Sequence, residues 1–437
     1  MKIYEIQALN FRCFEDSVFQ FSSEFNLLVG ANGSGKTSLL KAIVAAISTP
    51  INGLSKFSFW PLSEDSSARV ALVKSAGKIR YEKCFPVILR VLGQINEVDK
   101  SWWQERKGLA TQLDWDSSVY TLLQKMTVQV DQNESLTLPI CAFYSAERRW
   151  KLEEINASNA VRQQDSRLDA YNSWNDAAED LKNFESWIIA KSLERLEENS
   201  SQNSDGLEER SDYGFDELSL VNQAISQALP NSKGIRYDIR LRQLVVDWDF
   251  KEPSPFRNLS DGQRAIIGLI ADIARRMCLA NPHLDDRVLK ETPGIVIIDE
   301  LDMHLHPAWQ RRIPFVLRSA FPCIQFIAAS HSPQIIGELK AEEIILMRDG
   351  ISIGHPERAF GLESDEVLEE IMGAASQNLE VAKILDEFRD ALEDENIEKA
   401  ESELNALERI VVHPVPSVVA ARAALQSMKF LGEENEE

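Results

Sequence analysis

Residues 25 to 47 constrain the fold of this chain more than any other segment. The apolar run Phe25–Val29 has the character of a buried strand, and Ser38–Ile47 has the character of a helix. The loop between them holds three glycines, which let backbone N–H groups approach phosphate oxygens, and it ends in Lys36 and Thr37. A lysine at this place can reach the β- and γ-phosphates of a nucleotide, and a threonine hydroxyl can bind Mg²⁺. The segment therefore predicts a P-loop whose nucleotide-binding residues are Asn32, Gly33, Gly35, Lys36, Thr37 and Ser38.

The charge of the chain limits what it can bind. Of its 437 residues, 47 are basic and 69 are acidic, which gives a net charge of −22. Such a surface repels phosphate, which argues against an all-round wrap of nucleic acid or of an anionic membrane and leaves only local basic patches. The candidate patches for nucleic acid, each of which is also typical of ordinary surface or ion-paired arginines, are Arg148, Arg149 and Lys151, then Arg275 and Arg276, then Arg311 and Arg312.

The cysteines and the apolar runs indicate a compartment. Five cysteines are scattered and never form a Cys-x-x-Cys pair, which argues against a disulfide framework or a zinc ribbon. No run approaches the roughly 20 apolar residues of a transmembrane helix, and the first residues lack the pattern of an export signal. We therefore expect a cytoplasmic protein with no membrane partner.

A second apolar run, Gly294–Ile298, ends in two carboxylates, Asp299 and Glu300. Alone, this Walker B pattern is as often structural as functional. Together with a P-loop, it predicts that Asp299 joins Thr37 in binding Mg²⁺. Glu300 is the predicted base that activates water for attack on the γ-phosphate. The sequence thus favours an ATPase that uses ATP and Mg²⁺.

The segment Leu259-Ser260-Asp261-Gly262-Gln263 resembles the signature motif of ABC-type ATPases, in which glycine is more usual at the place of Asp261. On its own the segment is equally typical of a helix N-cap. The resemblance implies an α/β fold, namely a P-loop ATPase head with a mixed β-sheet flanked by helices. It also implies a homodimer in which Ser260, Gly262 and Gln263 of one copy contact the γ-phosphate held by the P-loop of the other.

Three further segments support the same resemblance. Phe326–Pro333 contains an apolar run that leads to His331, at the place of the family's switch histidine, which contacts the γ-phosphate region. Arg12 lies in an entry segment like that of these heads, which implies a contact near the nucleotide, and a plain surface arginine is the alternative. His306 stands where many members have an aspartate. Its His-Leu-His-Pro setting resembles overcoming-lysogenization-defect nucleases, RecF-like proteins and phage-defence ATPases rather than membrane transporters.

The chain divides into four expected regions. Residues 1–150 and 231–355 are the two parts of the ATPase head, with the P-loop in the first part and the other motifs in the second. Residues 151–230 are a helical insertion with a mobile loop near 199–212, and residues 356–437 are an acidic helical region. From residue 361 onward there are 20 acidic and 6 basic residues, which suits either a solvated face or a docking surface for a basic partner. The middle of the chain contains strand-like pieces at Arg69–Val73, Cys84–Leu92 and Met126–Val130.

Softer similarities extend over the whole chain. The Tyr144–Arg148 stretch, the Tyr171–Trp187 helix and the Phe360–Leu368 tail resemble the PtuA-like ATPases of Septu phage-defence systems, including ATPases attached to some retrons. This resemblance implies a homodimeric or higher ATPase that acts with a separate HNH nuclease in antiviral defence. The sequence itself contains no nuclease pattern. The alternatives are a RecF-like DNA-repair ATPase without a dedicated nuclease and an assembly protein that binds nucleotide with little turnover.

Overall fold

The computed structural model describes residues 1–75, 78–132, 135–147, 166–202, 216–374, 378–394, 396–411 and 415–434. The chain divides into two compact units, Met1–Leu362 and Glu363–Glu437. The division falls a few residues beyond the boundary expected at 356, because the intervening residues are bound to the first unit. The backbone N–H of Gly361 donates to the carbonyl of Gly337 at 2.9 Å, and Ala359 is buried.

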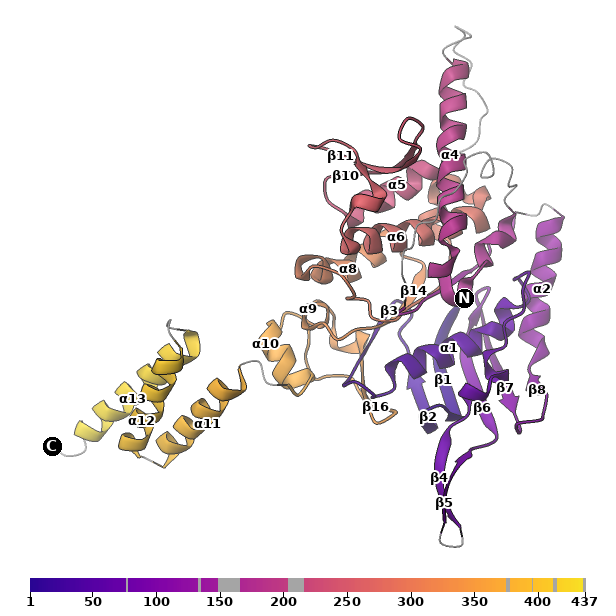
Figure 1. Cartoon of the computed structure of the whole chain (residues 1–437). Helices are drawn as coiled ribbons and strands as arrows, with labels where there is room; N and C mark the ends of the chain where they lie inside the picture. The colour runs from indigo at the N-terminus through magenta and orange to yellow at the C-terminus, as the bar shows by residue number, and fades with distance from the viewer. Residues whose placement is uncertain are drawn as a thin grey trace. The chain divides into compact units, whose positions relative to one another are not determined.

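A six-stranded sheet carries the P-loop in the first unit (Figure 1). Its strands, in spatial order, are β16 (Ile351–Gly354), β15 (Ile344–Arg348), β3 (Phe25–Val29), β14 (Ile324–Ala329), β13 (Gly294–Ile298) and β9 (Ile140–Tyr144). All neighbouring pairs are parallel except β15 and β16. The strands β3, β9, β13 and β14 are buried along their whole length. Parallel strands covered on both faces have mostly apolar sequences, which is why apolar runs mark β3, β13 and β14 in the sequence.

A second, antiparallel sheet packs over the helix that follows the P-loop. Its strands, in spatial order, are β2 (Phe14–Gln20), β1 (Lys2–Phe11), β6 (Val87–Ile95), β7 (Val98–Arg106) and β8 (Leu113–Trp115). Helix α1 (Lys36–Ile51) contacts strands of both sheets. On β7, the indole of Trp102 donates to the carbonyl of Ala46 at 2.9 Å and the amide of Gln104 donates to the carbonyl of Ala45 at 2.6 Å. The helix that begins at the P-loop is therefore held from both sides, and the α/β head with a mixed sheet is confirmed.

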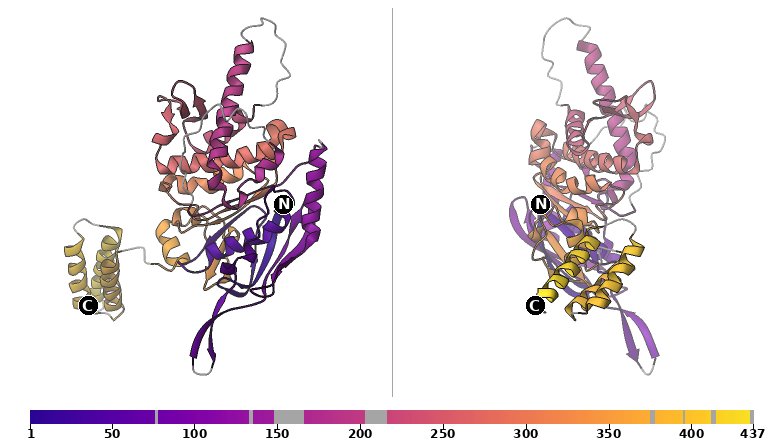
Figure 2. Two further views of the ribbon diagram at one scale, coloured as in Figure 1. Left: turned by 45° about the vertical axis from the view of Figure 1, so that its right-hand side comes forward. Right: turned by 90° about the vertical axis from the view of Figure 1, so that its left-hand side faces the viewer.

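Further helices lie beyond the central sheet, on the side away from α1 (Figures 1 and 2). They are α4 (Leu181–Gln202), α5 (Glu217–Ala228), α6 (Asp261–Ala280), α7 (Val288–Glu291), α8 (Pro307–Ala320) and α9 (Pro333–Ile336). A small sheet of β10 (Ser232–Asp238), β11 (Gln243–Trp248) and β12 (Ser254–Pro255) packs beside them. The loop expected near 199–212 is helical as far as Gln202, and the rest of that range lies outside the described residues.

Helix α2 (Ser117–Asp131) overturns the strand expected at Met126–Val130. The carboxylate of Asp116 caps the helix by accepting from the N–H of Ser118 at 2.8 Å. The helix buries residues spaced three or four apart, Val119, Leu123, Met126 and Val130, as one face of a helix requires. The β-branched residues in the window 126–130 favour a strand, and five residues are too few to show the period of a helix.

The second unit contains, among its described residues, a bundle of α11 (Leu379–Glu393), α12 (Ile397–Ile410) and α13 (Pro416–Glu434). The short helix α10 (Ser364–Glu366) precedes the bundle. Apolar side chains from all three long helices form its core, including Phe388, Leu404, Leu407 and Val418. The C-terminal region is therefore helical, as predicted, with a core of its own.

Candidate nucleotide-binding site

The P-loop leaves the carboxyl end of β3 and turns sharply into α1. Gly33 and Gly35 have φ values of 83° and 104°, a left-handed conformation that glycine adopts without steric cost. A Cβ on Gly30 would stand 2.3 Å from the carbonyl oxygen of Met347, so only glycine fits beside β15 at that position. The glycine spacing seen in the sequence therefore has a direct backbone reason.

The ammonium of Lys36 lies inside the curve of the P-loop. Its Nζ donates to the carbonyls of Gly30 at 2.8 Å and Ala31 at 3.1 Å. Burial lowers the pKa of Lys36, and the nearby carboxylates of Asp299 and Glu300 act in the opposite direction. An ammonium held in this place can exchange a carbonyl partner for a phosphate oxygen without leaving the loop.

The strands β13 and β14 bring the other predicted residues to the same place. Because both strands run parallel to β3, the segments that follow them meet at one edge of the sheet. They line a cavity of about 230 Å³ whose walls include Asn32, Gly33, Gly35, Lys36, Thr37, Ser38, Asp299, Glu300 and His331. The structure thus gathers in one cavity residues that lie about 300 positions apart in the sequence.

Glu300 adopts a strained backbone conformation within this cavity. Its φ is 48°, which costs a non-glycine residue of this kind on the order of 1–3 kcal/mol. The flanking residues hold it, since the N–H of Asp299 donates to the carbonyl of Tyr144 at 2.9 Å and that of Leu301 donates to Ala329 at 2.8 Å. Such strain is typical of functional positions, and it sets the direction in which the Glu300 side chain leaves the backbone.

His331 lines the same cavity. Burial lowers its pKa, and the charge of Lys36 lowers it further. Asp302 links the segment after Glu300 to that of the histidine, because its carboxylate accepts from the hydroxyl of Ser330 at 2.5 Å and from the N–H of His331 at 3.4 Å. The two segments therefore cannot move independently without losing these bonds.

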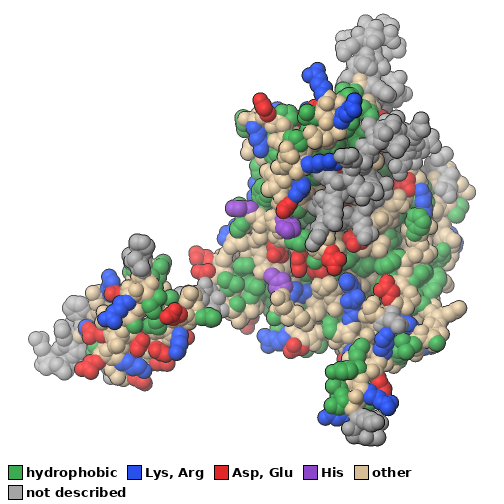
Figure 3. Space-filling model, viewed as in Figure 1, with side chains coloured by type: hydrophobic (Ala, Val, Ile, Leu, Met, Phe, Trp, Pro, Cys, Tyr) green, Lys and Arg blue, Asp and Glu red, His purple; other side chains and the backbone are tan. Residues whose placement is uncertain are grey.

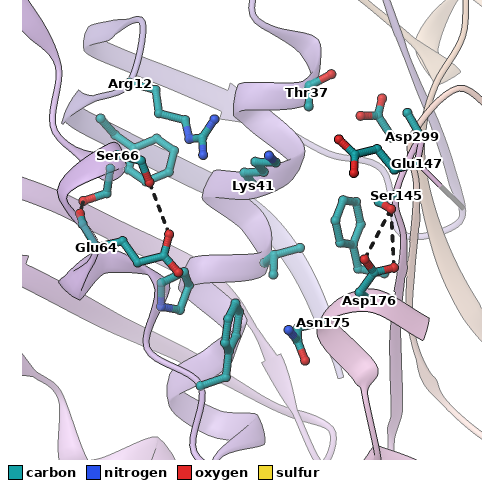
Figure 4. A pocket seen from close by; sticks show the side chains of 17 residues that line it. Arg12, Thr37, Lys41, Glu64, Ser66, Ser145, Glu147, Asn175, Asp176 and Asp299 are labelled. Carbon is teal, nitrogen blue, oxygen red and sulfur yellow. Dashed lines mark hydrogen bonds between the residues drawn. The ribbon is translucent and has the colours of Figure 1, made fainter. Parts of the chain in front are cut away.

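A second, larger cavity of about 410 Å³ adjoins the first and shares Thr37 and Asp299 with it (Figure 4). Arg12 and Lys41 point into it from one side, and Asp299 and Glu147 approach it from the other. Arg12 has a φ of 50°, and its backbone N–H donates to the carbonyl of Ser67 at 2.8 Å. Its buried Nε has no hydrogen-bond partner among the described residues, and burial lowers its pKa. The structure places Arg12 in a cavity wall beside the P-loop rather than on open surface.

Sequence reasoning missed the residues after β9. Ser145, Glu147 and Asp176 line the second cavity, and the hydroxyl of Ser145 donates to the carboxylate of Asp176 at 3.4 Å. In the described part of the chain no glutamine lines either cavity, and Gln104 binds the carbonyl of Ala45 instead. The available signal was the buried strand that ends at Tyr144, since polar residues just after such a strand reach the same sheet edge.

The predicted signature residues form the start of α6, which we term the signature helix. Ser260 caps it in a capping box, accepting from the N–H of Gln263 at 3.3 Å, while the N–H of Ser260 donates to the amide oxygen of Gln263 at 3.2 Å. A Cβ on Gly262 would stand 2.4 Å from the carbonyl oxygen of His304. Ser260, Gly262 and Gln263 line neither cavity, so one copy of the chain does not bring them to its own P-loop.

His306 has a local structural role. Its Nδ1 accepts from the N–H of Ala308 at 3.2 Å, which caps helix α8. An aspartate could supply the same cap, so the replacement preserves this part of the fold.

For one of the three candidate patches the alternative of ion-paired arginines holds. Arg275 and Arg276 are buried on the signature helix and bind Asp272, with Nη2 of Arg275 at 2.9 Å and Nε of Arg276 at 2.8 Å from its oxygens. Burial tends to raise the pKa of Asp272, but the charges of Arg276 and Arg275 outweigh it and lower that pKa. These arginines cannot reach a nucleic acid, because their positions on the helix face the core.

The other two patches fare differently. Arg311 and Arg312 are exposed, and Arg311 donates to the amide oxygen of Gln334 at 2.5 Å. Arg148, Arg149 and Lys151 lie outside the described residues.

The residues at the shared edge suit a magnesium nucleotide. The hydroxyl of Thr37 and the carboxylate of Asp299 border both cavities, and oxygen ligands of this kind are those that Mg²⁺ prefers. A phosphate chain at the P-loop would supply the remaining negative oxygens.

Comparison with known proteins agrees with this geometry. A model of the AAA domain matches residues 5–233, more than half of the chain, and a second AAA domain model matches residues 143–337. The chain belongs to the AAA domain family. This is a family of ATPases, and the matched residues 5–233 include the P-loop.

Two retron ATPases are similar over most of this chain's length, and a Septu protein is similar over about a third of it. The "Retron Ec83 probable ATPase" of Escherichia coli is 25% identical, over 89% of this chain and 80% of its own. The "Retron Vc95 probable ATPase" of Vibrio cholerae is 25% identical, over 80% of this chain and 74% of its own. The Septu protein PtuA of Bacillus thuringiensis is 27% identical, over 36% of this chain and 42% of its own.

Among solved structures, an Smc head bound to the C-winged helix domain of ScpA aligns over 84% of this chain and 100% of its own, at 14% identity and a TM-score of 0.46.

Within the described ranges, none of the helices combines the length and the apolar character needed to span a bilayer.

Proposed function

We propose that this protein is the ATP-binding and ATP-hydrolysing subunit of an antiviral defence complex, and that it controls a separate HNH-type nuclease. The observation that carries the ATPase part is the meeting of Lys36, Thr37, Asp299, Glu300 and His331 around one cavity. The defence part rests on the retron and Septu relatives, whose similarity spans most of the chain in the retron cases.

In the proposed reaction the P-loop N–H groups and Lys36 hold the phosphates, and Thr37 and Asp299 hold Mg²⁺. When bound, Mg²⁺ neutralises the charge that develops on the phosphates. Glu300 accepts a proton from the attacking water, and His331 orients the γ-phosphate as a neutral imidazole.

The proposed active form is a homodimer or a higher oligomer. Ser260 and Gln263 are partly or fully exposed at the start of the signature helix and line neither cavity of their own copy. Their N-terminal helix position suits an anion, so the γ-phosphate of a second copy is the expected partner. Dimer formation would then depend on ATP.

The test compares the wild type with Glu300→Gln and with a matched control, Glu24→Gln, which changes an exposed glutamate at the opposite end of β3. We expect Glu300→Gln to abolish ATP turnover and to prolong an ATP-dependent dimer in light scattering, while the control behaves as wild type. Unchanged turnover in Glu300→Gln would remove the assigned base. Co-purification with an HNH protein encoded by a neighbouring gene tests the defence role.

A RecF-like repair ATPase is the second candidate. A 76-residue segment is 37% identical to the DNA double-strand break repair Rad50 ATPase of Pyrococcus abyssi, which covers 16% of this chain. This candidate predicts ATP-dependent binding to gapped DNA by the protein alone, and a partner-free complex with such DNA would favour it.

A further inference from the structure

Two strands form a ribbon that belongs to neither large sheet. They are β4 (Val70–Ser75) and β5 (Lys78–Lys83), which pair antiparallel with each other. The ribbon projects from the rest of the first unit in every view (Figures 1 and 2). We refer to these two strands as the β4–β5 arm. In the described part of the chain, the strands of the arm pair only with each other, and such an isolated ribbon needs a reason to persist.

One face of the arm is apolar and exposed. Leu72 lies opposite Tyr81, Lys74 lies opposite Ile79, and Val70 lies opposite Lys83, so these side chains share a face. Val70, Leu72, Ile79 and Tyr81 are between 50% and 76% exposed. A lone two-stranded hairpin is only marginally stable in water, and a cluster of exposed apolar side chains usually marks an interaction site. Hydrophobic and basic side chains gather on the arm in Figure 3.

The arm also reverses the charge of the chain. Residues 70–83 carry four basic and one acidic side chain, whereas the whole chain carries a net −22. Neither Lys74 nor Arg80 has an ion-pair partner among the described residues, and both are exposed. Six residues of strand extend about 20 Å, which exceeds the Debye length of about 8 Å at physiological salt. Cations near the end of the arm are therefore screened from the acidic body.

We propose that the β4–β5 arm binds duplex nucleic acid by entering a groove. The major groove of B-DNA admits a two-stranded β-ribbon, and such ribbons are used for this purpose. Lys74 and Arg80 lie on opposite faces of the arm, because Arg80 pairs with Val73 rather than with Lys74. The face with Leu72 and Tyr81 would contact sugars, and Lys74 on that face would reach the phosphates beside them. Arg80, on the other face, would meet the opposite phosphate wall.

The base of the arm is joined by backbone hydrogen bonds to the wall of the second cavity. The N–H of Arg69 donates to the carbonyl of Asn10 at 2.8 Å, and the N–H of Arg12 donates to that of Ser67 at 2.8 Å. Ser67 and Arg12 both line the second cavity. A duplex held by the arm would thus act on the loop that borders the nucleotide, which predicts duplex-stimulated ATP turnover. This coupling rests on the proposed ATPase function, whereas the binding itself does not.

The test measures the fluorescence anisotropy of a labelled DNA duplex with the full chain. The variant is Lys74→Glu with Arg80→Glu. The matched control is Lys125→Glu with Lys290→Glu, which makes the same charge change at two exposed lysines on α2 and α7. We expect the arm variant to bind at least about tenfold more weakly, and the slope of log affinity against log salt to fall in magnitude by about 2. The control should keep the wild-type affinity and slope.

Several outcomes would overturn the proposal. They are a wild type that does not bind the duplex at low salt, an arm variant that binds as wild type, and a control that loses as much affinity as the arm variant. A variant that binds duplex normally but loses a protein complex in light scattering would make the arm a protein contact instead. Equal melting temperatures exclude misfolding. Because anisotropy requires no hydrolysis, an inactive ATPase that still binds duplex would count against the proposed function alone.

Discussion

The hydroxyl of Tyr144 donates to the carboxylate of Asp272 at 2.8 Å, which joins the end of strand β9 to the middle of the signature helix. Asp272 also binds Arg275 and Arg276, and Arg276 donates to the carbonyl of Asn172 at 2.9 Å. The residue after Tyr144 lines the second cavity, so this buried network connects the nucleotide edge to the helix that carries Ser260. A rotation of the signature helix would therefore be transmitted to Ser145 and Glu147.

Removing the carboxylate of this network should be strongly destabilising. In Asp272→Asn two buried guanidinium groups lose their counter-charge, and breaking a buried pair of this kind costs about 3–5 kcal/mol. Because the pKa of Asp272 is lowered in the folded state, its contribution is complete above its ordinary pKa of about 4 and is lost as pH falls through the lower folded value. Urea unfolding at neutral and acid pH measures both effects. The variant should lose stability at neutral pH and lose less on acidification; an unchanged midpoint would contradict this account.

The close approach of Gly262 to His304 gives a second prediction. Alanine normally stabilises a helix relative to glycine by about 1 kcal/mol, but a Cβ here meets a carbonyl at 2.4 Å. We expect Gly262→Ala to destabilise by about 1–3 kcal/mol and to abolish ATP-dependent dimers, while ATP binding to the P-loop persists. The control is Gly108→Ala, whose Cβ meets nothing nearer than 3.7 Å. Melting temperature measures the stability, light scattering the dimer and calorimetry the ATP binding. A normal dimer in Gly262→Ala would refute the packing argument.

Arg12 allows stability and binding to be separated. Its φ of 50° favours glycine, so Arg12→Gly should raise the free energy of unfolding by up to about 1 kcal/mol. The same change removes a guanidinium from the cavity and should weaken ATP binding about tenfold or more, as the loss of a charge-assisted hydrogen bond does. Arg12→Lys should retain part of the affinity, and Lys36→Ala serves as the reference for abolished binding. Calorimetry that finds wild-type affinity in Arg12→Gly would assign Arg12 a structural role only.

His331 should make the stability and the ATP turnover of the protein fall at acid pH. Its pKa is lowered, by burial first and by Lys36 second, so the ring is neutral at pH 7 and its protonation is disfavoured in the folded state. Stability associated with this histidine is thus present above its ordinary pKa of about 6.5 and is lost as pH falls through that value towards the lower folded one. We expect melting temperature and ATP turnover to fall over this range in the wild type. In His331→Gln the fall in melting temperature should be smaller, and an identical pH profile would show that another group titrates.

The sequence predicted those site residues that directly follow a buried strand of the central sheet. Lys36, Asp299 and His331 each stand just beyond an apolar run, and parallel strands bring such positions together. For Arg275 and Arg276 the sequence left a basic patch and ion-paired arginines both open, and the spacing of three and four residues from Asp272 is the signal that favours the ion pair. The sequence did not distinguish the strands of the β4–β5 arm from strands within a large sheet. Their exposure depends on how other parts of the chain pack rather than on their own residues.

The strand order of the central sheet also determines when each strand can pair during translation. Among the described residues, strand β3 pairs with β14 and β15 alone, and these begin about 300 residues later in the chain. At a translation rate of roughly 5–20 residues per second, the P-loop strand waits about 15–60 s for its neighbours. During that interval a nascent chain exposes an unpaired apolar strand, so the ribosome-bound intermediate, rather than the finished protein, is the species most exposed to aggregation and most in need of a chaperone.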